Sequence, residues 1–158
     1  MVLRETTAAD LPDLRELWND GRVMRWVGFP TGLGMTAGQA ASWLDAIRRD
    51  PTRHHYVVVE RQLGFCGEAY YRVRPERRAE LDIKLRPEAQ GRGIATAALS
   101  RLIETVFARE PDVDAVFTEP NDGNEAAERL YARCGLRPAP RPPGLWPADS
   151  YWERRRDA

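Results

Sequence analysis

The chain has 158 residues, of which 24 are basic and 24 acidic, so its formal net charge is zero. A neutral chain lacks the positive field that attracts nucleic acids and anionic membranes, and we expect neither as a partner. A chain of this length can bury most of its apolar surface in one core, so residues 1–158 are predicted to form a single domain. Because no segment has the pattern of a membrane span or a signal peptide, we predict a cytoplasmic protein.

The first half of the chain carries strand and helix patterns in alternation. Apolar residues at helical spacing follow the cap residues Thr7 and Thr36 and predict two helices, which end at Gly21 and Asp50. A loop rich in glycine and bulky apolar residues is expected between the helices, over residues 22–35. Strand patterns, the last two spaced for a hairpin, cover residues 1–6, 55–60 and 65–73.

The second half predicts two more helices. One follows a glycine turn at residues 90–95 and ends before Pro111, and the other begins at Asn124 and ends at Gly135. The proline-rich run 137–147 is expected to be an irregular surface loop. Strand patterns cover residues 79–86, 115–118 and 150–154.

The glycine turn is the most informative segment, and it reads Gln90-Gly91-Arg92-Gly93-Ile94-Ala95. Its glycines let the backbone present N–H groups at a helix N-terminus, an arrangement that holds phosphate groups. A Walker loop would need Gly-Lys-Ser/Thr at the helix start, where this chain has Gly93-Ile94-Ala95. A dinucleotide loop would need a third small residue where Thr96 stands. Neither nucleotide motif therefore accounts for the turn.

Two motifs together indicate a family. The glycine turn resembles the Gln/Arg-x-x-Gly-x-Gly/Ala loop of the GCN5-related N-acetyltransferases, which bind acetyl-CoA. The segment from Asn124 to Leu136 resembles the same family's Asn-x-x-Ala-x-x-Leu-Tyr-x-x-x-Gly-Phe, with Leu136 in place of phenylalanine. That difference changes packing and not chemistry.

The resemblance implies an α/β (α+β) fold, in which helices flank a mostly antiparallel sheet that is splayed open between the fourth and fifth strands. It also implies transfer of the acetyl group of acetyl-CoA to a primary amine by direct attack in a ternary complex. An alternative is a sensor or regulatory module that binds acyl-CoA without turnover. We expect no metal, because adjacent His54 and His55 have too few companion ligands.

The resemblance further implies which residues contact acetyl-CoA. Backbone groups of the central strand would pair with the pantetheine arm, the glycine turn would bind the pyrophosphate, and an asparagine would cap the last helix while facing the arm. The expected contact residues are Ile83, Lys84, Leu85, Gln90, Gly91, Arg92, Gly93, Ile94, Ala95, Thr96 and Asn124.

Acetyl transfer needs a base for the amine and an acid for the departing thiolate. Tyr131 occupies the position of the family's tyrosine and is the expected acid, although it also fits an apolar helical stripe that would bury it in the core. Asp82 is the preferred base, because it lies toward the expected splay, and Glu80 and Glu119 are the alternatives. Each carboxylate can instead pair with a basic neighbour across the sheet.

The acceptor amine is expected to contact the loops 22–35 and 137–147. Proteins that this chain resembles acetylate ribosomal protein N-termini, aminoglycosides, polyamines and amino acids. The aromatic residues that can wall the acceptor pocket are Trp26, Phe29, Trp146, Tyr151 and Trp152. A homodimer paired through the final strands and a monomer that buries Tyr151 and Trp152 are both compatible with the sequence.

Overall fold

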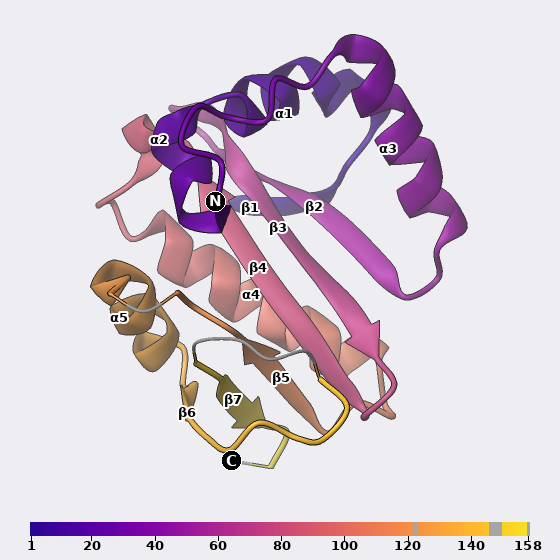
Figure 1. Cartoon of the computed structure of the whole chain (residues 1–158), viewed down its shortest axis with the longest axis vertical. Helices are drawn as coiled ribbons and strands as arrows, with labels where there is room; N and C mark the ends of the chain where they lie inside the picture. Colours follow the sequence, from indigo (N-terminus) through magenta and orange to yellow (C-terminus); the bar gives the residue numbers. More distant parts are fainter. Residues whose placement is uncertain (122, 146–149, 158) are drawn as a thin grey trace.

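The computed structural model describes residues 1–121, 123–145 and 150–157. One sheet runs through the molecule with strand order β1-β2-β3-β4-β5-β7-β6 (Figure 1). Neighbouring strands are antiparallel except for β4 and β5, which are parallel. The strands are β1 Val2–Glu5, β2 Arg53–Glu60, β3 Gly64–Arg74, β4 Arg78–Leu85, β5 Ala115–Thr118, β6 Arg137–Pro138 and β7 Trp152–Arg155.

Helices cover both faces of the sheet (Figure 1). α4 packs on one face against β1, β3 and β4, while α1 and α3 pack on the other face against β3 and β2. α5 contacts α4 beside the C-terminal strands. The helices are α1 Leu11–Trp18, α2 Gly21–Met24, α3 Ala37–Arg49, α4 Ile94–Arg109 and α5 Glu125–Arg133.

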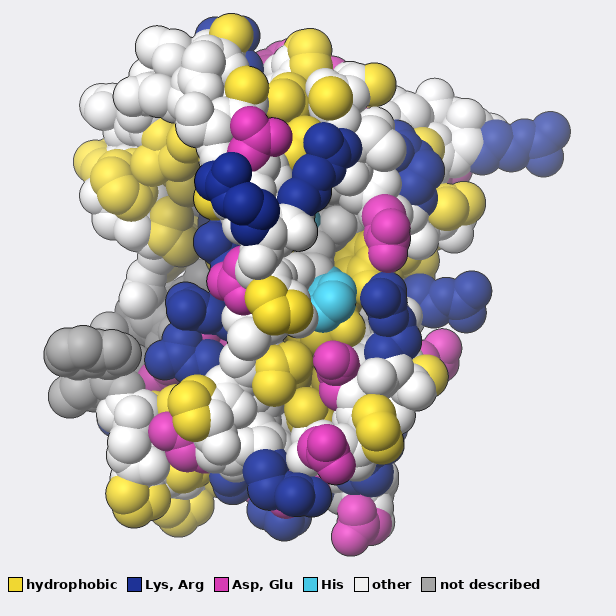
Figure 2. All heavy atoms as spheres, turned by 90° about the vertical axis from the view of Figure 1, so that its right-hand side faces the viewer, with side chains coloured by type: hydrophobic (Ala, Val, Ile, Leu, Met, Phe, Trp, Pro, Cys, Tyr) yellow, Lys and Arg dark blue, Asp and Glu magenta, His cyan; other side chains and the backbone are white. Residues whose placement is uncertain are grey.

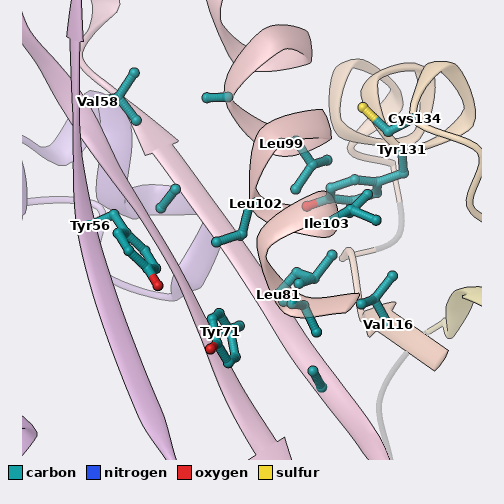
Figure 3. Packing of buried hydrophobic residues seen from close by; sticks show 14 of the residues in the cluster. Tyr56, Val58, Tyr71, Leu81, Leu99, Leu102, Ile103, Val116, Tyr131 and Cys134 are labelled. Carbon is teal, nitrogen blue, oxygen red and sulfur yellow. The ribbon is translucent and has the colours of Figure 1, made fainter. Parts of the chain in front are cut away.

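The alternating sequence of β4 assigns its side chains to two faces, as predicted. Leu81 is buried in the larger core with Leu99 and Leu102 of α4, and Figure 3 shows these side chains in the layer between strand and helix. The polar residues Asp82 and Lys84 alternate with that set and face the side covered by α1 to α3. This second face carries the polar groups of the site described below.

The sheet splits between β4 and β5. The two strands pair only from Arg78–Ala115 to Glu80–Phe117, and β5 ends at Thr118. Within the described part of the chain no strand pairs with residues 81–85 on this side of β4. The predicted splay between the fourth and fifth strands is therefore confirmed, and it leaves one edge of a central strand available to a ligand.

Gly21 does not end the first helix as predicted. α1 ends at Trp18, and Gly21 begins the short helix α2, so the expected loop 22–35 contains helical structure. A Cβ atom at Gly21 would lie 2.1 Å from the carbonyl oxygen of Pro30. Glycine is required there because two chain segments lie in close contact. The sequence pattern alone does not show this contact and suggested a helix end.

The proline-rich segment is also more regular than predicted. Arg137 and Pro138 form the edge strand β6, which pairs with β7. Proline is tolerated at an edge because only one side of the strand must donate hydrogen bonds. The last strand begins at Trp152 and not at Ser150. Among the described residues, no helix is long and apolar enough to cross a membrane.

Arg156 ties the C-terminus to the end of α4. Its guanidinium donates to the carbonyls of Phe107, Glu110 and Val113 at 2.6 to 3.0 Å. These acceptors include carbonyls left unpaired at a helix C-terminus, where a cation is also favoured by the helix dipole. We expect Arg156→Ala to lower the free energy of unfolding by about 2 kcal/mol in urea titrations.

The neighbouring Arg155 is the matched control, because it is exposed and makes a single ion pair with Glu153 at 3.8 Å. Arg155→Ala should change the free energy of unfolding by less than about 0.5 kcal/mol. Equal losses in the two variants would contradict the role given to Arg156.

Candidate active site

A cleft opens where β4 and β5 separate. Its volume is about 670 Å³, and it extends from Gln90 before α4 to Tyr131 on α5. Residues 80–85 of β4 form one wall, and residues 118–121, from the end of β5 onward, form the opposite wall. Side chains between residues 22 and 28 close a third side. A ligand in this cleft contacts an unpaired strand edge together with side chains from several separate segments.

The glycine turn presents N–H donors beside Gln90. Gly91 and Gly93 have φ angles of +73° and +78°, which other residues adopt only with strain. Gly93 is the N-cap of α4 and provides no capping side chain. For the described residues, no acceptor within the protein bonds the N–H groups of residues 91–96. These donors at the positive end of a helix dipole fit a phosphate group.

The side chains of β4 that face the cleft form an ion-pair network. The Lys84 ammonium bonds Asp82 and lies 3.9 Å from the carboxylate of Glu68 on β3. Burial alone would lower the pKa of Lys84, but Asp82 and Glu68 outweigh burial and raise it. Asp82 also accepts the N–H of Ile83 at 2.9 Å. Lys84 therefore stays charged, and Asp82 is engaged by two donors.

Glu80 has a different environment. Its carboxylate lies 3.6 Å from Arg74. Burial raises the pKa of Glu80, Arg74 opposes this effect, and the nearby carboxylates of Glu119 and Asp82 add to it. Glu119 itself is paired with Arg141 at 3.1 Å. The surroundings of Glu80 thus raise its proton affinity.

Tyr131 belongs both to the core and to the cleft. It is 8% exposed, and Figure 3 shows its ring extending from α5 among Leu99, Ile103 and Val116. Burial raises the pKa of the Tyr131 phenol, and a hydrogen bond with the Thr118 side chain opposes this effect. The phenol therefore remains protonated at neutral pH while lining the cleft.

Two predicted ligand residues also make structural hydrogen bonds. The Asn124 side chain accepts the N–H of Ala127 at 3.2 Å, so its predicted role as N-cap of α5 is confirmed. The Arg92 side chain is exposed and donates to the carbonyl of Glu88 at 3.0 Å. Ile94 buries its side chain in the core and can offer a ligand only its backbone.

Known proteins share both the sequence pattern and the fold. The family described as the acetyltransferase (GNAT) domain matches residues 1–137. The chain belongs to this family. The GNAT assignment confirms the predicted family, fold and class of enzyme. No curated protein sequence shows a significant match to the chain.

Solved GNAT structures superpose on nearly the whole chain. A ribosomal-protein-alanine N-acetyltransferase from Brucella melitensis is 26% identical, with a TM-score of 0.77 and coverage of 98% of this chain and 99% of that one. A spermidine N-acetyltransferase from Vibrio cholerae, in complex with CoA and spermine, is 19% identical, with a TM-score of 0.83 and coverage of 99% and 95%. The aminoglycoside acetyltransferase AAC(6')-Ib, in complex with coenzyme A, is 20% identical, with a TM-score of 0.79 and coverage of 99% and 95%. Similarity at these levels supports the GNAT architecture for this chain.

Most residues predicted from the sequence meet in the cleft. The residues of the glycine turn after Gln90 lie next to it and are not part of its lining. Predicted site residues that line the cleft are Glu80, Asp82, Ile83, Lys84, Leu85, Gln90, Glu119, Asn124 and Tyr131.

Of the predicted aromatic residues that the structure describes, Trp26 alone lines the cleft. Tyr151 is buried inside the chain, where it stacks on Phe117 and its hydroxyl contacts Arg78 and Glu153. Of the alternatives left open for Tyr151, burial within the chain is the one that the structure shows. Phe29 and Trp152 are absent from the described lining, and Trp146 lies outside the described residues.

Sequence reasoning missed Glu68 and Tyr70 of β3. Both alternate with apolar residues on one strand, and they pair in register with Lys84 and Asp82 of β4. The same period-two pattern that identified the polar face of β4 would have shown a polar face on β3. The missing information was the register, which places these two faces side by side.

Proposed function

We propose that residues 1–158 act as one acetyltransferase domain that transfers the acetyl group of acetyl-CoA to a primary amine in a ternary complex. The observation that carries this proposal is the cleft from Gln90 to Tyr131, with unpaired N–H groups in the residues that follow Gln90. Acetyl-CoA supplies an activated thioester, and this chain supplies an anion site, an unpaired strand edge and two groups suited to proton transfer. CoA or acetyl-CoA is present in several of the similar GNAT structures.

The residues of the chain have distinct roles in this proposal. N–H groups of residues 91–96 would bind the pyrophosphate, and the edge of residues 81–85 would pair with the pantetheine arm. The Ile83 N–H would polarise the thioester carbonyl. Its present hydrogen bond to the Asp82 carboxylate would have to break first. Tyr131 would protonate the sulfur as the C–S bond breaks.

Glu80 is the proposed base for the acceptor amine, in place of Asp82. Asp82 already accepts from Lys84 and from the backbone, whereas the pKa of Glu80 is raised mainly by burial. A carboxylate with a raised pKa is a stronger base once it is ionised. The proton removed as the amine nitrogen bonds the acetyl carbon would pass to Glu80 directly or through a water.

Thiol release measured with acetyl-CoA and a panel of amines tests the proposed function. We expect release that depends on an added amine, and calorimetry should show CoA binding without any amine. The proposed reaction would be contradicted if the protein binds CoA but no peptide, polyamine or monoamine causes thiol release from acetyl-CoA. Lack of CoA binding by folded protein would contradict the proposed site as well.

Glu80→Gln should lower kcat about tenfold at pH 7, because glutamine cannot accept the proton. Glu80 acts only when ionised, and its pKa is raised above the ordinary 4.5. The ratio of wild-type to variant kcat should therefore fall toward one as pH drops through this raised pKa. Parallel profiles of kcat against pH for Glu80→Gln and Asp82→Asn provide the measurement. Asp82 would be the base instead if the ratio of wild-type to variant kcat is large at pH 7 and falls with pH for Asp82→Asn but stays near one for Glu80→Gln.

A further inference from the structure

A second cavity lies beside the cleft on the same face of the sheet. This side pocket has a volume of about 190 Å³ and is covered by residues of α1, α2, α3 and the loop before α3. Tyr70 and Lys84 line both the side pocket and the cleft, so the two spaces share a wall. The side pocket and the cleft are therefore adjacent on this face of the sheet. The apolar wall of the side pocket consists of Trp18, Met24, Leu33, Met35, Trp43 and Ile47.

The one carboxylate that lines the side pocket within the described residues, that of Glu68, is already compensated. The Glu68 carboxylate accepts Trp18 Nε1–H at 2.6 Å, with His55 Nε2 at 3.4 Å and Lys84 Nζ at 3.9 Å. The Glu68 and Lys84 side chains are only 4% and 11% exposed. A polycationic ligand would find no uncompensated carboxylate here and would place charge against apolar walls, which is costly. The side pocket therefore selects against a second positive charge.

The size and the walls of the side pocket fit an aromatic ring. Apolar protein cavities of about 150 Å³ can bind benzene, so about 190 Å³ accommodates a phenyl group with a short linker. The rings of Trp18 and Trp43 meet edge to face at 4.7 Å, and Trp43 meets His55 in the same manner at 4.7 Å. Such rings offer both faces and edges for stacking. Figure 2 looks at the side of α3 and β2, where a histidine lies between hydrophobic side chains and basic ones.

We propose that the acceptor is a primary monoamine that carries an apolar group of about phenyl size, which binds in the side pocket while the amine lies in the cleft near Glu80. This inference rests on the proposed function. It differs from the polyamine and aminoglycoside ligands of the similar structures, which carry several positive charges. The amine would approach Glu80, which lines the cleft and whose carboxylate is 41% exposed and 3.6 Å from Arg74.

The test compares 2-phenylethylamine, ethylamine and spermidine as acceptors by kcat/KM for thiol release. We expect 2-phenylethylamine to exceed ethylamine at least about 30-fold, because its ring leaves water for an apolar pocket. Spermidine should be a poorer acceptor than 2-phenylethylamine. Calorimetry in the presence of CoA should show 2-phenylethylamine binding, which measures occupancy of the site without turnover.

Variants that fill the side pocket test its location. Met35→Trp and Ile47→Trp replace half-buried lining residues, and either should reduce the preference for 2-phenylethylamine to less than about threefold. Ala46→Trp is the matched control, since Ala46 is exposed on α3 and does not line the side pocket. This control should keep the wild-type preference. Affinity for CoA verifies that each variant is folded.

Three results would overturn the inference. They are a wild-type preference for spermidine, equal use of ethylamine and 2-phenylethylamine, and a preference that persists in both filled variants. Each of them leaves amine-dependent thiol release intact, so the proposed function would stand. If no amine supports release and 2-phenylethylamine does not bind, the proposed function fails together with the inference.

Discussion

Replacement of Tyr131 by phenylalanine is expected to lower kcat by about 100-fold or more, within the range contributed by general acids. Tyr131 packs in the core and also lines the cleft, so phenylalanine keeps the ring packing and removes the hydroxyl. The affinity for CoA should stay within about twofold of wild type, because backbone donors hold the pyrophosphate. Steady-state kinetics and calorimetry on the same preparations separate the two effects.

The dependence on pH gives a second readout for Tyr131. Burial raises the pKa of its phenol above the ordinary 10.0, so the protonated form persists as pH increases through that value. Ionisation of Tyr131 should therefore not reduce wild-type kcat below pH 10. Tyr56→Phe is the control: it removes a buried hydroxyl that contacts Arg109 at 3.0 Å, away from the cleft, and should leave kcat unchanged. Full activity of Tyr131→Phe would exclude the phenol as the acid.

Gly93→Ala should weaken CoA binding by about 10- to 100-fold, the second largest effect that we expect. The φ angle of +78° at Gly93 aims the following N–H groups outward, and alanine there either strains the backbone or rotates those groups away. A Cβ atom at Gly93 would meet no protein atom within 4 Å, so the substitution creates no clash within the protein. Calorimetric titration with CoA measures the change.

Gly64→Ala is the matched control for backbone strain. Gly64 has a φ angle of +70° at the start of β3, and a Cβ atom there would also meet nothing within 4 Å. Both substitutions should lower the free energy of unfolding by about 1 kcal/mol. Only Gly93→Ala should affect CoA binding. Comparable losses of CoA affinity in both variants would mean that general destabilisation, and not the turn, is responsible.

The local pattern of the sequence predicted most elements, because strand and helix periods are set by neighbours along the chain. The β4 alternation, the β5 strand and the Asn124 cap all appear as predicted. Gly21 and Pro138 were misinterpreted for a common reason. Whether a glycine ends a helix or admits a close contact, and whether a proline lies on a strand edge, depends on segments distant in sequence.

The candidate site divides in a similar way. Sequence alone determined the glycine turn before α4, the tyrosine on α5 and the carboxylates of β4, because each belongs to a local motif. Only the tertiary structure decided which carboxylate is engaged: the β3–β4 register brings Glu68 to Lys84, and Lys84 in turn holds Asp82. The tertiary structure also created the side pocket, because its lining residues come from helices and strands far apart in the chain. Ion pairing and cavity shape depend on distances in space, which periodicity along a sequence does not encode.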